Sequence, residues 1–197
     1  MDFIRICILL VPIFWKISDA VPIQRQLLSK SDEFIGRCKY TLIKDCRDGV
    51  SPEFDVTAEM HEDGLTEDGF PSINIIGVEV LVHGDRHIKL DAAGTVTVDG
   101  KVITNFPYIV DDKDGDGELA ELTQKDGITS ITLKRVKSGL TWNHVLHVFG
   151  TSLTGGEFKE HVCGLYSVFY GGEKEAILAS NPNYHKTWEI PGSCIPD

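Results

Sequence analysis

The fold of this chain is decided by the stretch GRCKYTLIKDC, which runs from Gly36 to Cys46. Its polar and apolar residues alternate as in a β-strand, where successive side chains point to opposite faces. One face would hold Cys38, Tyr40, Leu42 and Cys46, and the other Lys39, Thr41 and Asp45. Extended backbone separates the two cysteines too far for them to bond each other. We therefore expect a strand that is tied at both ends to distant parts of the chain.

The first twenty residues have the features of a cleaved secretory signal. Arg5 precedes an apolar run from Ile6 to Trp15, and small residues stand at the two positions that a signal peptidase reads. The alternative is a membrane anchor, but the run is too short to span a bilayer and Lys16 interrupts its end. We expect a secreted, extracellular protein with three parts: a signal peptide over residues 1–20, a lead-in segment over 21–34 and a single domain over 35–197.

Cleavage of the signal peptide would remove Cys7 and leave an even number of cysteines, namely Cys38, Cys46, Cys163 and Cys194. Secreted proteins meet an oxidising environment, so these four are expected to form two disulfides. Four cysteines allow three pairings, and composition does not choose among them.

The formal net charge of −11 bears on the partner class. The signal segment holds equal numbers of acids and bases, so the mature chain keeps this value. Nucleic acids and anionic membranes attract cationic surfaces, which makes both poor partners for this chain. No later stretch has the length of a membrane-spanning helix, and no Asn-x-Ser/Thr site for N-linked glycan occurs. An extracellular protein or matrix component is the expected partner.

Strand patterns dominate the rest of the sequence. Phe54 to Met60 alternates cleanly, and an acidic loop over 62–72 is expected to follow. From Ile73 to Val82 the apolar phase slips beside a glycine, which predicts a β-bulge at Ile76-Gly77. Further strands are expected at Ile88–Leu90, Thr95–Val98, Lys101–Ile103, Phe106–Val110, Leu119–Leu122, Ile128–Val136 and Trp142–Phe149, with a tight hairpin turn at Asp99-Gly100.

Little of the chain has a helical pattern. Residues 173–179 could form one or two turns near the C-terminus. Many short strands without long helical periods predict an all-β fold, an antiparallel β-sandwich with at most one short helix near the C-terminus.

The order of several motifs resembles the von Willebrand factor type D domain family. The opening stretch is similar to the family pattern G-x-C-x-Y-x-L-x-x-D-C, and the order continues from there to about residue 195. The matching segments are HIKLDAAGTVTVDGKVI (87–103), GLTWN (139–143), EHVCGLYSVFYGG (160–172) and YHKTWEIPGSC (184–194). The resemblance implies disulfides between Cys46 and Cys163 and between Cys38 and Cys194.

The chain departs from the family pattern in three places. The family's opening strand, with its G-D-P-H motif and a cysteine, is missing. The second cysteine of the C-G-L-C motif is Tyr166, and in the family these two absent cysteines look like partners. The acidic cluster that resembles a calcium site in the family reads Tyr170-Gly171-Gly172-Glu173-Lys174 here. These losses argue against inherited thiol exchange, self-cleavage and calcium binding.

A second candidate calcium site is the loop of Asp112, Asp114, Asp116 and Glu118, which matches the first half of an EF-hand loop. Its twelfth position, Thr123, is not the required bidentate Glu, and no helices flank it. A solvated hairpin loop is therefore favoured, and calcium binding is the alternative. No other cofactor is expected.

Two histidines offer a metal site of another kind. His83 and His87, with Asp85 between them, are expected at the two ends of a polar loop if Val82 pairs with Ile88. Catalytic zinc needs three protein ligands and an ordered second shell, and the sequence identifies neither. His144 and His147, read as one strand, would face opposite sides. Ordinary loop histidines are favoured, with a metal-dependent hydrolase as the remote alternative.

The sequence as a whole predicts a secreted, disulfide-stapled binding or structural module that is not an enzyme. No nucleophile elbow, zincin motif or phosphate-binding loop is present. Without the family's assembly cysteines, a monomer is expected. The alternative is a calcium-binding matrix protein, or a component of venom or another secretory fluid.

Overall fold

The computed structural model describes residues 37–65, 71–115, 117–153, 158, 161–167, 170 and 183–195. The expected signal peptide, the lead-in segment, the helix at 173–179 and Asp116 lie outside these ranges. The elements are β1 (Cys38–Asp45), β2 (Phe54–Leu65), β3 (Pro71–Val82), β4 (Arg86–Asp91), β5 (Val96–Val98), β6 (Lys101–Ile103), β7 (Tyr108–Asp111), β8 (Glu118–Lys125), β9 (Ile128–Leu133), β10 (Ser138–Asn143), β11 (Val148–Leu153), β12 (Val162–Cys163) and α3 (Tyr184–Thr187).

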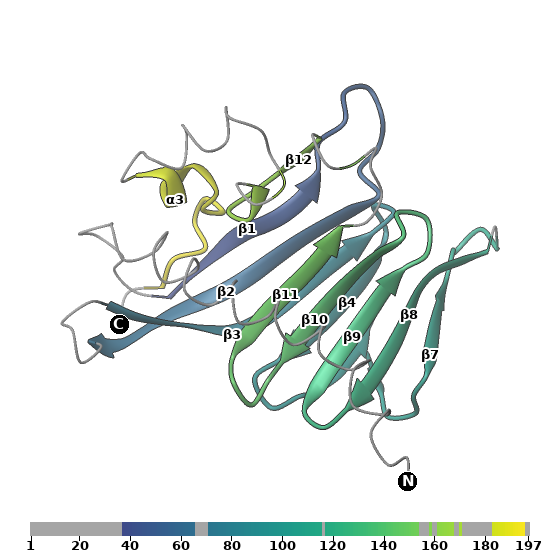
Figure 1. Cartoon of the computed structure of the whole chain (residues 1–197), viewed down its shortest axis with the longest axis horizontal. Coiled ribbons are helices and arrows are strands. Elements are labelled where there is room, and N and C mark those ends of the chain that lie inside the picture. Colours follow the sequence, from purple (N-terminus) through teal and green to yellow (C-terminus); the bar gives the residue numbers. More distant parts are fainter. Residues whose placement is uncertain are drawn as a thin grey trace, which may run out of the picture.

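These strands form two antiparallel sheets that pack face to face (Figure 1). The larger sheet has the order β12-β1-β2-β3-β4-β5-β6, and the smaller has the order β11-β10-β9-β8-β7. Neighbouring strands are mostly consecutive in sequence because short turns connect them. The exception is β1, which lies between β2 and β12. The predicted all-β antiparallel sandwich is confirmed, and its short helix α3 lies near the C-terminus.

The core lies between the sheets and is built from the inward residues of each strand. Phe54, Val56, Ala58 and Met60 of β2 are fully buried, and Leu140 and Trp142 of β10 in the smaller sheet belong to the same core cluster. Trp142 is buried completely, and its indole Nε1 donates a hydrogen bond to the Asp91 carbonyl at 3.1 Å. Because Asp91 belongs to the larger sheet, this bond joins the two layers.

Two predicted local features are confirmed. The pairing of β2 with β3 passes from Glu59–Gly77 to Met60–Ile75, which leaves Ile76 as the extra residue of a β-bulge. The turn between β5 and β6 is formed by Asp99 and Gly100, with φ angles of 48° and 79°. Both angles are positive, as a two-residue hairpin turn that matches the strand twist requires.

The opening strand differs from its predicted alternation. A register shift between Thr41 and Ile43 reverses the faces of the residues that follow. Leu42 and Ile43 are both buried, Asp45 points inward with 2% of its surface exposed, and Cys46 is exposed beyond the strand end. The expectation that both cysteines share the inward face, with Asp45 outside, was therefore wrong, because a bulge breaks the period of two.

Three other expectations are also corrected. The acidic loop at 62–72 is shorter than expected, because β2 continues to Leu65 and β3 begins at Pro71. Val82 pairs with Arg86, and it is Val80 that pairs with Ile88, so the turn at His83 is tighter than expected. Trp142–Phe149 is not one strand: residues 144–147 form the turn between β10 and β11, so His144 and His147 are turn residues.

Candidate functional site

The outer edge of β1 is closed by two segments from the last third of the chain. Beside its C-terminal half lie β12 and the residues that follow. Leu165 N donates to the Thr41 carbonyl at 3.1 Å and Tyr166 N to the Leu42 carbonyl at 2.7 Å. Beside its N-terminal half lies the segment 188–195, in which Ile190 N donates to the Lys39 carbonyl at 2.9 Å. The edge of the first strand is thus paired by backbone that arrives more than a hundred residues later.

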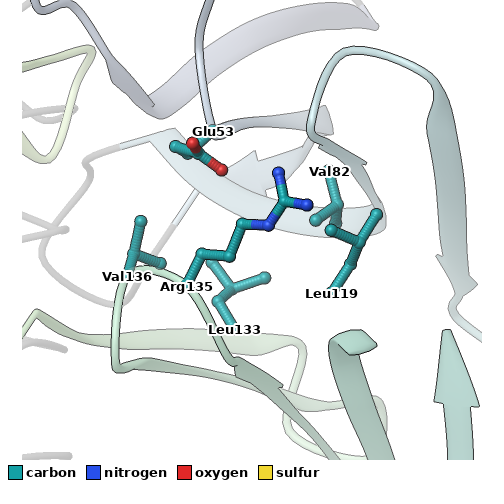
Figure 2. A pocket seen from close by; sticks show the side chains of 6 residues that line it. All are labelled: Glu53, Val82, Leu119, Leu133, Arg135 and Val136. Carbon is teal, nitrogen blue, oxygen red and sulfur yellow. The ribbon is translucent and has the colours of Figure 1, made fainter. Parts of the chain in front are cut away.

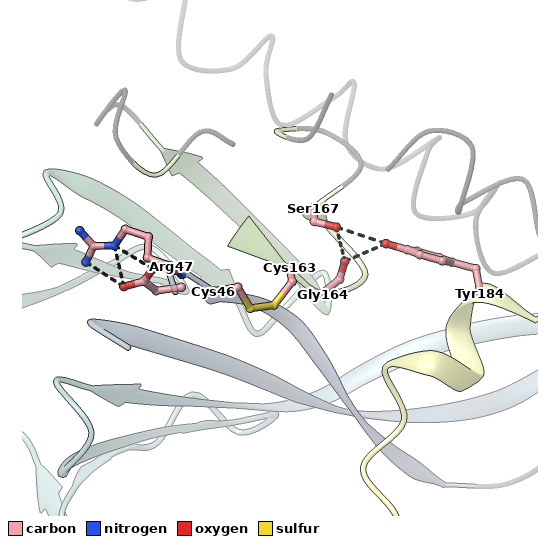
Figure 3. The surroundings of a disulfide bond; sticks show 7 residues. Cys46, Arg47, Cys163, Gly164, Ser167 and Tyr184 are labelled. Carbon is pink, nitrogen blue, oxygen red and sulfur yellow. Dashed lines mark hydrogen bonds and ion pairs between the residues drawn. A yellow bond between two sulfur atoms is a disulfide. The ribbon is translucent and has the colours of Figure 1, made fainter. Parts of the chain in front are cut away.

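Two disulfides fasten these segments, one on each half of the strand. Cys38 is bonded to Cys194, 156 residues away in sequence, and Cys46 is bonded to Cys163, 117 residues away. The bonds are nested, since the second lies inside the loop that the first closes. Figure 3 shows the Cys46–Cys163 bond where the end of β1 meets β12. We call β1 with its two covering segments, 161–166 and 188–195, the clamp.

Gly164 lets the first covering segment approach β1 closely. Its φ of 123° is a conformation that other residues rarely adopt. A Cβ at this position would lie 2.5 Å from the Leu42 carbonyl oxygen and 2.8 Å from Ile43 N. The glycine of the C-G-L motif is therefore required both by its backbone angle and by its contact with β1.

A buried hydroxyl pair supports Gly164 from the other side (Figure 3). Tyr184 of α3 donates to the Gly164 carbonyl at 3.0 Å, and Ser167 Oγ donates to the same oxygen at 2.8 Å. The two hydroxyl oxygens are 3.2 Å apart. Because Tyr184 lies just before the segment 188–195, this contact links the two covering segments of the clamp to each other.

An ion pair between a buried carboxylate and a partly exposed arginine ends the strand beside the Cys46–Cys163 disulfide. Asp45 accepts hydrogen bonds from Arg47 Nη2 at 2.9 Å and Nε at 3.0 Å, and from the backbone N–H of Glu53 at 3.1 Å. Burial raises the pKa of Asp45, but these hydrogen bonds outweigh that effect and hold it below the usual range. The Arg47 guanidinium also lies 4.2 Å from the centroid of the Phe158 ring. The alternating pattern did not predict this ion pair, because it placed Asp45 on the outer face of the strand. An Asp and an Arg two residues apart at a strand end were the signal that could have indicated it.

Among the described residues, one group of Cys, His, Asp and Glu side chains has a spacing that could suit a metal ion. It consists of Cys38, Cys194 and Glu189. Both sulfurs are committed to a disulfide, and the Glu189 side chain is hydrogen-bonded to the Tyr40 hydroxyl. The arrangement is part of the clamp and does not indicate a metal centre.

The acidic loop between β7 and β8 is bound to the rest of the sandwich through Asp112. Its carboxylate accepts the Asp114 N–H at 3.1 Å and Arg135 Nη2 at 2.9 Å. The pKa of Asp112 is lowered, first by the Asp114 N–H, against the effect of burial, and then by the positive charge of Arg135. Glu118 has Lys134 4.0 Å away. The first carboxylate of the candidate calcium loop thus already has a cationic partner.

His83 and His87, the expected metal pair, have separate partners. His83 Nδ1 lies 3.3 Å from Glu53, and Arg135 Nη1 lies 2.9 and 3.0 Å from the two nitrogens of the His83 ring. His87 Nε2 lies on β4, 3.6 Å from Glu79. The two histidines are not brought together in a group of three ligands within the described part of the chain.

Arg135 is the residue at the centre of this end of the sandwich that sequence patterns did not single out. It lies in the turn after β9, and Figure 2 shows its guanidinium extended between Glu53 and the apolar side chains of Val82 and Leu119. The notch that it crosses is small and open to solvent. With its bonds to His83 and Asp112, Arg135 ties the two sheets together.

No helix in the described ranges has the length and apolar character needed to cross a membrane. The family model described as von Willebrand factor type D domain matches residues 31–169. A search of curated proteins found no match. The matched region contains β1 to β12 and three of the four clamp cysteines, and the chain therefore belongs to the von Willebrand factor type D domain family.

Proposed function

We propose that this chain is a secreted extracellular module that binds another extracellular protein or a matrix component and catalyses no reaction. Type D domains are modules of extracellular proteins that mediate protein interactions, which supports this interpretation. The observation that carries the proposal is the clamp. Disulfides persist in oxidising compartments and are rare in the cytosol. A fold whose first strand is covalently joined to its last segment suits a protein that must survive outside the cell.

The clamp is suited to mechanical and conformational stability, because its polar side chains bond to groups of the clamp itself. Asp45 is paired with Arg47, and the Tyr184 and Ser167 hydroxyls bond the Gly164 carbonyl. These contacts fix backbone and leave the sandwich faces and turns to contact a partner. Binding through a rigid β-sandwich is the role that the geometry supports best.

Expression of the full chain in a secretory cell line tests the proposal. We expect the protein in the medium, with an N-terminus near Val21 and no free thiol, and we expect it to capture a protein from extracellular fluid or matrix. The control is the variant in which Cys38 and Cys194 are both serine, which should be retained or secreted poorly. Intracellular protein with an intact N-terminus and reduced cysteines would contradict the proposal.

A further inference from the structure

The two disulfides of the clamp differ in how their sulfur atoms meet the solvent. Cys38 faces the core and is 3% exposed, so the Cys38–Cys194 bond is approached from the side of Cys194. In the other bond, Cys46 is exposed and Cys163 is partly exposed. The bulge in β1 is the cause, because it turns the residues after Ile43 so that Cys46 points outward. The Cys46–Cys163 bond therefore lies where a thiol in solution can reach it.

A positive charge lies next to the Cys46–Cys163 bond. Lys44 of β1 is paired with Cys163 of β12 in the antiparallel register. Residues directly opposite each other on antiparallel strands have side chains on the same face, with Cβ atoms about 4.5 to 5.5 Å apart. Asp55, the partner of Lys44 on β2, is one strand farther from Cys163. The register therefore places a cation beside the Cys163 sulfur.

A negative charge lies next to the other disulfide. The Glu189 carboxylate is within 4.8 Å of both the Cys38 and the Cys194 sulfur. The Tyr40 hydroxyl is hydrogen-bonded to this carboxylate and holds it in place. A carboxylate disfavours a thiolate on either sulfur, because two negative charges would lie close together. Burial of Cys38 adds to this effect, since a buried thiolate loses its hydration.

We propose that the Cys46–Cys163 disulfide is a site of reversible thiol exchange, which a small thiol such as glutathione opens while Cys38–Cys194 stays closed. A thiolate cleaves a disulfide faster when the leaving sulfur is stabilised as a thiolate. Attack on the exposed Cys46 sulfur makes Cys163 the leaving group, next to the Lys44 ammonium. The equivalent attack on Cys194 would release Cys38 as a buried thiolate beside Glu189.

The exchange takes place in two steps. In the first, the glutathione thiolate bonds to the Cys46 sulfur, the Cys46–Cys163 bond breaks, and Cys163 leaves as a thiolate that takes a proton from water. In the second, another glutathione thiolate attacks the glutathione sulfur of the mixed disulfide, so Cys46 leaves and is protonated and oxidised glutathione is released. Two glutathione molecules thus supply the two electrons. Residue 166 is a tyrosine, so a C-x-x-C motif does not supply the second thiol from within the chain.

Opening this bond should loosen one end of the clamp and leave the sandwich folded. β12 is two residues long and pairs with the end of β1 alone among the described strands. The Cys46 N–H donates to the His161 carbonyl at 2.7 Å. Without the disulfide, the end of β1 and residues 161–163 lose their covalent connection, whereas Cys38–Cys194 still closes the loop that contains them. The Cys46 amide should then exchange its hydrogen faster, and the amides of β10 should be unchanged.

Treatment of the oxidised full chain with reduced glutathione, followed by alkylation of free thiols and peptide mapping, tests the proposal. The Cys46–Cys163 bond should open at least about tenfold faster than Cys38–Cys194. Its rate should increase in proportion to the glutathione concentration, because the thiol attacks the folded chain directly. In concentrated urea the two bonds should open at similar rates, since unfolding removes both the burial of Cys38 and the ordered charges.

Variants of the two neighbouring charges test their roles. Lys44→Gln should slow the opening of Cys46–Cys163 about fivefold, and high salt should reduce this difference from wild type. The matched control is Lys89→Gln, which removes the same charge from β4 on the same outer face and should react like wild type. Glu189→Gln keeps an acceptor for the Tyr40 hydroxyl and should speed the opening of Cys38–Cys194 alone.

Three results would overturn the proposal. They are equal or faster opening of Cys38–Cys194 in the folded chain, an opening rate that does not depend on the glutathione concentration, and equal rates in Lys44→Gln and Lys89→Gln. The measurements start from folded, oxidised protein and do not rest on the proposed function. A secreted chain that resists glutathione would leave the proposed function intact, and a chain that captures no extracellular protein can still show the exchange.

Discussion

At the scale of single residues, Asp45 shows how a buried charge can be held in a β-sandwich. Its carboxylate has two donors on Arg47 and further N–H donors, so the charged form is favoured despite burial. Because its pKa is lower in the folded than in the unfolded state, the pair stabilises the fold above the ordinary Asp pKa of about 3.9. That contribution is lost as the pH falls through the folded-state value.

Asp45→Asn should therefore lower the free energy of unfolding at pH 7 by about 2 to 4 kcal/mol. The Arg47 side chain is 27% exposed, so water can still solvate its charge when the carboxylate is removed, and this limits the loss of stability. Urea unfolding at pH 7 and at about pH 2.5 checks this, and the difference from wild type should shrink at the acid pH. Asp55 is the control, because burial raises its pKa against the effect of Lys44. Asp55→Asn should be neutral or stabilising at pH 7.

The close contact between Gly164 and β1 can also be tested by substitution. Gly164→Ala should lower the free energy of unfolding by about 3 kcal/mol or more. The new Cβ would clash with the backbone of β1, and alanine would have to adopt an unfavourable φ. Gly49 separates the two effects, because it also has a positive φ of 75° but no atom within 4 Å of the place a Cβ would take. Gly49→Ala should cost about 1 kcal/mol. Equal losses of thermal stability in the two variants would show that the contact with β1 is unimportant.

At the scale of elements, the question for the acidic loop between β7 and β8 is whether its carboxylates form an internal ion pair or bind a cation. Asp112 is bound to Arg135 and to the Asp114 N–H, whereas the Asp114 side chain is exposed. We expect Asp112→Asn to lower the melting temperature in the presence of a chelator, and Asp114→Asn to leave it unchanged. Millimolar calcium should give no calorimetric heat and no shift in melting. A calcium-dependent shift that both variants abolish would restore the calcium-binding alternative.

The elements also show which parts of the fold local sequence can predict. The Asp99-Gly100 turn and the Ile76 bulge were predictable because residue type and apolar phase determine them over a few positions. The turn at 144–147 was missed because it contains no Gly or Pro. Hydrogen bonds from its backbone to the Asn143 side chain stabilise this turn, and His147 adopts a positive φ of 54°. Neither feature interrupts the apolar pattern in the sequence, which therefore looked like that of a strand. Asn143 was the available signal, since Asn favours turns.

At the scale of the whole molecule, alternation predicted the sandwich but not the pairing of β1 with the end of the chain. Strand patterns identify which residues face a core, and they contain no information on which distant backbone meets an edge. The Arg135 contacts could not be predicted either. Its two partners, His83 and Asp112, come from different sheets, and strand patterns do not show how the sheets meet. The clamp was expected only through the family resemblance.

The clamp leads to the last prediction, which concerns its two disulfides. On the chain-entropy model, a bridge that closes more than a hundred residues contributes about 4 to 5 kcal/mol. Since the Cys46–Cys163 bond lies inside the loop closed by Cys38–Cys194, whichever forms second closes a shorter effective loop and adds less. Replacing either pair by serine should therefore cost less than half of what replacing both pairs costs. Urea unfolding of the two double variants and the quadruple variant measures this, and strictly additive losses would contradict the nested arrangement. Peptide mapping without reduction gives an independent check, because a peptide joining Cys38 to Cys46 or to Cys163 would exclude the clamp.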